Sequence, residues 1–278
     1  SAGDRPGAAA PSGRPGAVEG AASSPRSQVD AIRREQLEGI GSPEMRDMFA
    51  GCIGLLSADI YSSRSRVLLE LLQNADDNEF DLPDTEVPRA CFQLLTAAAP
   101  AGEWGSEEVH YLLAASNEVG LGWEDLCGLC TISASSKKGK EGKTGRKGIG
   151  FKSVFAVCSC PYVLSGRYTF RFDARGDALG CLTPSWVPEP ELGTLPAAAL
   201  DLWRAGLTCF CLPLAPGAPG RVVARELEEH LRALDPATML FLRRVRRVDV
   251  RLLDGSRLSL EHGGARGSSG PGGAATEV

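Results

Sequence analysis

The spacing of apolar residues along the first third of the chain predicts that helices precede strands. Val29, Ile32 and Leu37 recur with the period of an α-helix, and Ser42-Pro43 looks like the start of another helix. The helices predicted in this part of the chain cover about residues 28–39, 43–49, 53–60 and 64–77.

Further along the chain, short apolar or alternating runs indicate strands, mixed with a few helices. The expected strands cover residues 90–96, 109–115, 162–164, 168–173, 180–182, 207–214, 247–253 and 257–260. Helices are expected at 123–130, 149–158 and 221–234, and residues 184–196 are expected to form a proline-rich connection. The first two strands suit a hairpin with a long tip.

Both ends of the chain are rich in small and polar residues. Residues 1–27 and 263–278 contain too few large apolar side chains to offset the entropy of ordering the chain, so we expect them to be disordered. Residues 28–262 remain as one domain.

Composition narrows the class of protein. The chain has 278 residues, 43% hydrophobic content and a net charge of −5, which argues weakly against nonspecific nucleic-acid binding. No apolar run reaches the ~18 residues of a membrane-spanning helix, and nine cysteines suit reduced thiols. We therefore expect a soluble intracellular protein, cytoplasmic or nuclear, that does not bind membranes.

Polar side chains are aligned on the helix predicted at residues 64–77. Glu70, Asn74 and Asp77 are spaced i, i+4 and i+7 and share one face, whereas Asp76 points elsewhere. Burying such groups on a leucine-rich helix is costly without partners, which indicates a polar ligand or a metal.

Several common motifs fail on inspection. Gly142-Lys143-Thr144 imitates the end of a P-loop, but Lys137 stands where that motif needs a glycine. Neither Gly120-x-Gly122 nor Gly148-x-Gly150 has the third glycine of a dinucleotide fingerprint. Cys127-x-x-Cys130 has no second pair for zinc, so small buried thiols are the better interpretation.

Four motifs in order remain, and together they resemble the GHKL superfamily of Bergerat-fold ATPases. They are Glu-x-x-x-Asn-Ala-x-Asp at 70–77, Glu-x-Gly-x-Gly at 118–122, Gly-x-x-Gly-x-Gly-Phe at 145–151, and Gly-Leu-Thr at 206–208. The sequences around residues 69–78 and 145–155 look closest to the sacsin-like branch, which is similar to the heat-shock chaperone ATPases. The resemblance implies an α+β fold: a two-layer sandwich with a mixed, mainly antiparallel sheet and helices on one face.

The resemblance also implies ATP and Mg²⁺ as ligands, and a role for each motif. Glu70 matches the general base that orients water, and Asn74 matches the Mg²⁺ ligand. Glu118 stands where most of the superfamily has the aspartate that binds adenine; its extra methylene leaves the choice of nucleotide open, and Asn117 is a second candidate for this contact. The residues thus expected around the nucleotide are Asn74, Asp77, Glu118, Gly120, Gly122, Lys137, Gly145, Arg146, Lys147, Gly148, Ile149, Gly150, Phe151, Lys152 and Thr208.

The loop at residues 133–144 matches the lid that orders over bound triphosphate. The implied function is an ATP-hydrolysing, chaperone-like module that acts with a protein partner or downstream domain and can dimerise on binding ATP. The alternative is a nucleotide-sensing or scaffold module that does not hydrolyse ATP. Arginines 243, 244, 246 and 247 favour a solvated face over a nucleic-acid site.

Overall fold

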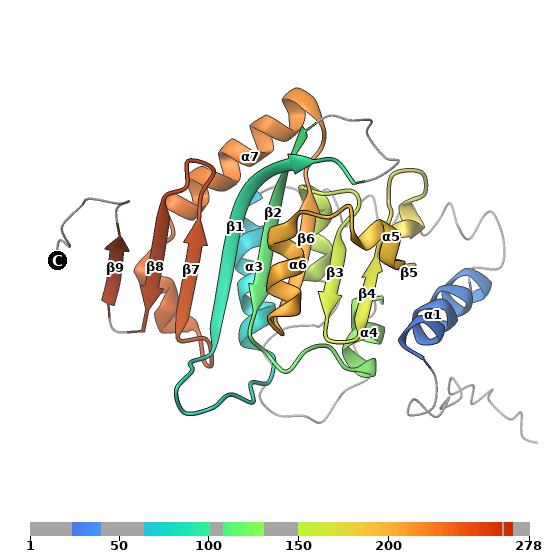
Figure 1. Ribbon diagram of the computed structural model, residues 1–278, viewed down its shortest axis with the longest axis horizontal. Coiled ribbons are helices and arrows are strands. Elements are labelled where there is room, and N and C mark those ends of the chain that lie inside the picture. The colour runs from blue at the N-terminus through green and yellow to red at the C-terminus, as the bar shows by residue number, and fades with distance from the viewer. Residues whose placement is uncertain (1–23, 40–63, 101–107, 131–149, 263, 269–278) are drawn as a thin grey trace, which may run out of the picture.

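A single open sheet dominates the computed structural model, which describes residues 24–39, 64–100, 108–130, 150–262 and 264–268 (Figure 1). Within these residues nine strands are ordered β5-β4-β3-β6-β2-β1-β7-β8-β9. The strands are β1 (Arg89–Ala98), β2 (Glu108–Ser116), β3 (Tyr162–Ser165), β4 (Tyr168–Arg171), β5 (Ser185–Trp186), β6 (Thr208–Pro213), β7 (Arg247–Arg251), β8 (Arg257–Glu261) and β9 (Gly264–Ser268). Neighbours pair antiparallel except β1 and β7, which are parallel.

Helices cover both faces of the sheet, unequally. The larger hydrophobic core lies beneath α3 (Arg64–Asp76) and α7 (Gly217–Arg232), with α1 (Pro25–Gly39) and α4 (Trp123–Leu129) at the same layer. On the opposite face a smaller core lies under α5 (Glu189–Leu192) and α6 (Ala197–Arg204), in front of the sheet in Figure 1. The short 3-10 helices are η1 (Phe151–Ala156), η2 (Ala178–Cys181) and η3 (Pro236–Phe241). The predicted α+β class with a mixed, mainly antiparallel sheet is confirmed, but the expectation of helices on one face only is wrong, because α5 and α6 cover the second face.

Alternation of side chains between the two faces of each strand explains how the sheet packs against its helices. Along β1 the side chains of Ala90, Phe92 and Leu94 are buried against the α3 side, while the intervening residues face α6. On α3 the buried Val67, Leu68, Leu71 and Leu72 follow the helical period. These two patterns place α3 directly over the central strands.

Three local predictions differ from the structure. Residues 180–182 are not a strand, because the Asp177 carboxylate accepts a hydrogen bond from the Leu179 amide at 2.9 Å and caps η2. The proline-rich connection at 184–196 contains α5, whose N-cap is Pro188, and α6 begins directly after it with Pro196 as its N-cap; proline fits the start of a helix as well as it breaks one. The helix predicted at 149–158 is the shorter η1.

Both of the ends predicted to be disordered contain regular structure. Helix α1 begins at Pro25, inside the first of them, and β9 occupies residues 264–268 of the second. The helices predicted at 43–49 and 53–60 lie outside the described residues.

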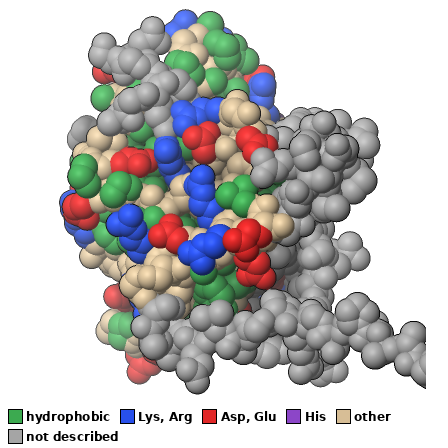
Figure 2. Space-filling model, turned by 90° about the vertical axis from the view of Figure 1, so that its right-hand side faces the viewer, with side chains coloured by type: hydrophobic (Ala, Val, Ile, Leu, Met, Phe, Trp, Pro, Cys, Tyr) green, Lys and Arg blue, Asp and Glu red, His purple; other side chains and the backbone are tan. Residues whose placement is uncertain are grey.

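Charges of both signs mix at the end of the molecule that carries α1 and β5 (Figure 2). Arg171 pairs with Glu191 at 3.2 Å there. None of the described helices combines the length and apolarity that crossing a membrane requires.

Candidate functional site

The middle of α3 meets the last glycine of the predicted phosphate-binding turn. A Cβ added at Gly150 would collide with Glu70 Oε2 and lie 3.8 Å from Asn74 Oδ1. Without a side chain, Gly150 leaves the Glu70 carboxylate in this position, which a larger residue would displace. The fold brings Glu70 and Asn74 on α3 next to Gly150, although Gly150 comes 80 residues after Glu70 in the sequence.

Glu70 keeps its carboxylate partly accessible. The side chain is 23% exposed and contacts Arg66 Nε at 3.4 Å, one helical turn earlier. Because an exposed i,i+4 pair contributes only about 0.3–0.5 kcal/mol, this arginine does not fix the carboxylate strongly.

At the carboxyl end of α3 the acidic residues serve the fold. Asp76 is buried and accepts backbone hydrogen bonds from Arg243, Arg244 and Val245 at 2.7–2.8 Å. Asp77, predicted beside the nucleotide, forms an ion pair with Arg243 at 2.7 Å instead. Both aspartates thus anchor the segment that leads into β7.

This contact also corrects the interpretation of the basic cluster at residues 243–247. Arg243 pairs with Asp77, and the Arg244 guanidinium donates to the carbonyl of Asn78. These two arginines are partly exposed but tie β7 to α3, rather than forming only a solvated face.

Glu118 is buried at the end of β2 and accepts a hydrogen bond from the Asn78 side chain. It borders a cavity of about 10 Å³ between α3 and the sheet, whose walls include Leu71, Ala75, Ser116 and Phe210. Such a space holds at most about one water molecule. As the described residues are packed, it does not accommodate a purine base.

Asn117 is bonded to the start of β1. Its Oδ1 accepts the Arg89 amide at 2.8 Å, and its Nδ2 donates to the Val87 carbonyl at 3.0 Å. These bonds give Asn117 a structural role, and a second role beside Glu118 in base recognition stays a prediction.

Thr208 belongs to a buried hydroxyl pair. Its Oγ1 lies 2.6 Å from Ser165 Oγ, which also accepts the Leu121 amide at 2.8 Å. Gly120, at φ +90°, takes a conformation that other residues rarely adopt. The chain Thr208–Ser165–Leu121 therefore sets the course of the loop after β2, and Gly122 then begins α4 with its amide 3.1 Å from Asp125 Oδ2.

Lys152, predicted to add positive charge at the phosphate site, is bonded to the protein itself in this structure. Its ammonium donates to the carbonyls of Leu129 at 2.6 Å and Cys181 at 2.5 Å. It also lies 4.5 Å from the ring centroid of Phe172. Burial lowers the pKa of Lys152 to about 8, opposed by the Cys130 and Cys181 thiols.

With this geometry in place, sequence comparison identifies relatives. Residues 55–183 match the Sacsin domain family model. The chain is also 32% identical over 247 residues to Protein NO VEIN of Arabidopsis thaliana, a match that covers 84% of this chain and 8% of that protein. The chain thus spans less than a tenth of this relative. Both findings support the sacsin-like family.

The Sacsin domain match contains three of the four motifs that indicated the family, and only the motif ending at Thr208 lies beyond it. Of the predicted residues inside the match, Lys137, Gly145, Arg146, Lys147, Gly148 and Ile149 lie outside the described residues, as does the predicted lid. Phe151 is buried 5.5 Å from the ring of Phe172 and supports η1 from within the core.

The prediction missed two residues of this region. Asn78 directly follows the motif at 70–77 and ends the stretch 69–78 that looks closest to the sacsin-like branch, so its contact with Glu118 had a sequence signal. Ser165 had none, because a single serine at the end of a strand is ordinary.

The described residues show no preformed metal site: no group of three or more His, Cys, Asp or Glu side chains is placed to hold an ion. Burial raises the pKa of the Cys127 thiol to about 11 and that of Cys130 to about 12, which keeps both protonated. The eight cysteines in this part of the chain are free thiols, as predicted.

Proposed function

We propose that this chain is a Mg²⁺-dependent ATP-binding module of a sacsin-like protein, and that it hydrolyses ATP to change the conformation of a larger protein. The contact of Gly150 with Glu70 and Asn74 carries this proposal. It is supported by the Sacsin domain match, which spans the same three residues.

Each of the three residues has a distinct task in the proposal. The Gly150 backbone gives phosphates close access, and the amide oxygen of Asn74 suits Mg²⁺, a hard ion that keeps several waters. The partly exposed Glu70 carboxylate orients the attacking water as a general base. ATP supplies the triphosphate that completes the metal site.

The packing around Glu118, the predicted adenine contact, favours a second function: scaffolding, or nucleotide sensing without hydrolysis. The cavity beside Glu118 is about 10 Å³, so adenine enters only if α3 or its neighbours move. Such a movement would couple nucleotide binding to a conformational change of the protein. Tight packing equally suits a chaperone-related scaffold that needs no nucleotide.

The test combines ATP binding, measured by isothermal titration calorimetry with Mg²⁺, and phosphate release. Glu70→Gln should keep binding and lower turnover by about 100-fold or more, because general-base catalysis contributes ~10²–10⁴-fold. Asn74→Ala should lose the Mg²⁺ dependence of binding. The matched controls are Glu79→Gln and Gln73→Ala, an exposed carboxylate and an exposed amide close by.

The outcomes separate the two functions. Turnover that depends on Glu70 supports the ATPase. Binding with no more phosphate release than Glu70→Gln indicates nucleotide sensing. Absence of ATP binding leaves the scaffold role.

A further inference from the structure

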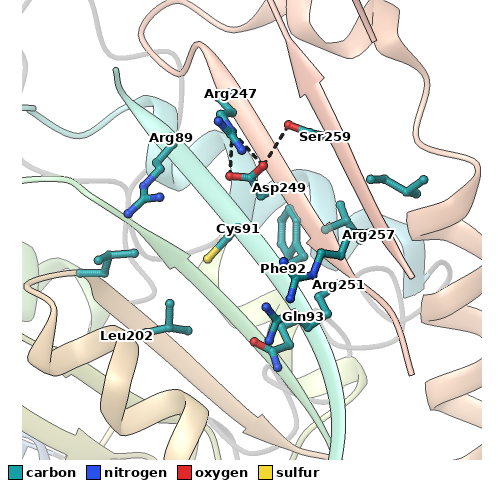
Figure 3. Close-up of a pocket in the computed structure, with 13 residues that line it drawn as sticks. Arg89, Cys91, Phe92, Gln93, Leu202, Arg247, Asp249, Arg251, Arg257 and Ser259 are labelled. Atoms are coloured by element: carbon teal, nitrogen blue, oxygen red, sulfur yellow. Dashed lines mark hydrogen bonds and ion pairs between the residues drawn. The ribbon is translucent and has the colours of Figure 1, made fainter. Parts of the chain in front are cut away.

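A groove opens on the face of the sheet opposite α3, between α6 and β8 (Figure 3). It has a volume of about 430 Å³, and its walls come from β1, β7, β8 and the α6–β6 segment. The proposed nucleotide site does not include it, because the sheet separates the two.

Four of the residues lining this groove are arginines, against one aspartate: Arg89, Arg247, Arg251, Arg257 and Asp249. Arg89 stands directly beside Arg247 in the β1–β7 register, and Arg251 stands opposite Arg257 in the β7–β8 register. Like charges directly opposite in a sheet are destabilising. Arg247 is compensated by Asp249 at 2.8 Å and by Glu261 at 3.7 Å, whereas the Arg251–Arg257 pair and Arg89 leave an excess of positive charge that an anionic partner would neutralise.

Only part of this charge is neutralised within the described residues. Arg247 Nε contacts both carboxylate oxygens of Asp249 at 2.8 and 2.9 Å, and Ser259 donates to the same carboxylate at 2.9 Å (Figure 3). Asp249 is therefore held at the middle of the groove, between the two arginine pairs.

The spacing of the charges distinguishes one type of anion from another. Arg247 and Arg251 are four positions apart on β7, about 13 Å along a strand. A continuous polyanion would place negative charge over Asp249. An extended peptide places two carboxylates about 13 Å apart when they are four residues apart, and the side chain between them points to the same face.

Apolar side chains line the α6 side of the groove, where Leu202 and Leu207 lie, and Cys91 on β1 adjoins Asp249 in the register. Burial raises the pKa of the Cys91 thiol to about 11, so it stays uncharged.

We propose that this groove binds an extended acidic peptide segment of a partner protein, with two carboxylates four residues apart and an apolar residue midway. The arginine pairs bind the carboxylates, and the apolar side chain midway packs against the α6 side of the groove at Leu202 and Leu207. Arginine suits this task because its guanidinium forms paired hydrogen bonds with carboxylate.

The experiment measures fluorescence anisotropy of labelled peptides with the whole chain. The probe contains Glu-Ala-Leu-Ala-Glu, one control replaces both glutamates by glutamine, and a second keeps two glutamates but places them side by side. We expect both controls to bind at least about 10-fold more weakly, since each lost charged contact costs on the order of tenfold.

Protein variants give an independent test. Arg251→Ser with Arg257→Ser should weaken the probe about 10-fold or more, whereas Arg221→Ser with Arg225→Ser, on the exposed face of α7, should not. Equal binding of the three peptides overturns the proposal whatever the variants do. Tighter binding of a single-stranded oligonucleotide than of the probe, lost in the groove variant, overturns the peptide assignment.

Discussion

Carboxylates lie at both ends of the motif on α3, but they have different roles. Asp76 is 5% exposed and accepts three backbone hydrogen bonds. Glu70, six residues earlier, is 23% exposed and faces Gly150. One end of the helix is committed to the fold, and the other retains a carboxylate that solvent can reach.

This difference shows what helical phase can and cannot establish. It correctly separated Asp76 from Glu70 and Asn74. Helical phase also grouped Asp77 with Glu70 and Asn74. However, α3 ends at Asp76, and beyond the helix the i, i+4, i+7 spacing no longer determines where a side chain points. Asp77 therefore meets Arg243.

The largest expected effect is on the fold. Asp76→Ala removes the acceptor of three buried amides, and we expect the free energy of unfolding to fall by about 3–5 kcal/mol, because hydrogen bonds to charged groups contribute ~1.5–3 kcal/mol each and do not add fully. Urea denaturation measures the loss. Asp84→Ala, in an exposed loop, should change stability by less than about 0.5 kcal/mol; equal effects of the two variants would contradict the anchoring role.

A second prediction concerns the cation two residues after Gly150. The folded-state pKa of Lys152 is about 8, below its ordinary 10.5. Between these values the unfolded chain holds a proton that the folded chain has lost, so the lysine's contribution to stability rises with pH. Relative to Lys152→Met, we expect the wild type to gain about 1 kcal/mol per pH unit from pH 8 to about 10.

The measurement is the difference in unfolding free energy between the two proteins. The buried cysteines, whose pKa values are raised, lose stability in the same range, but they are present in both proteins and largely cancel. A difference that does not vary with pH would mean that Lys152 is solvated, which would restore it as a candidate phosphate contact.

Much of the fold was predictable, because the determining signals are local. Alternation gave the β1–β2 hairpin, and the leucine period gave α3. The parallel pairing of β7 with β1 was not predictable, since it joins strands more than 140 residues apart and depends on the three amides that Asp76 binds. Prolines 188 and 196 misled because proline both ends and begins helices.

The site was predictable where function requires a particular residue at a particular spacing. A larger residue at position 150 would meet the Glu70 carboxylate unless that side chain moved, so motif and geometry agree there. The contacts of Lys152 were not predictable, because sequence does not reveal whether a lysine beside glycines faces solvent or the aromatic cluster around Phe172. The contacts of Asn117 were not predictable either, because its bonds to Arg89 and Val87 are long-range.

The smallest expected effect completes the comparison within α3. Glu70→Gln removes a carboxylate whose ion pair with Arg66 is exposed and long, at 3.4 Å, so we expect stability to change by less than about 0.5 kcal/mol. Urea denaturation, run beside Asp76→Ala, measures this directly. A loss of about 2 kcal/mol or more would place Glu70 with Asp76 as a structural residue. Its loss of turnover could then no longer be assigned to chemistry, because the scaffold would have changed as well.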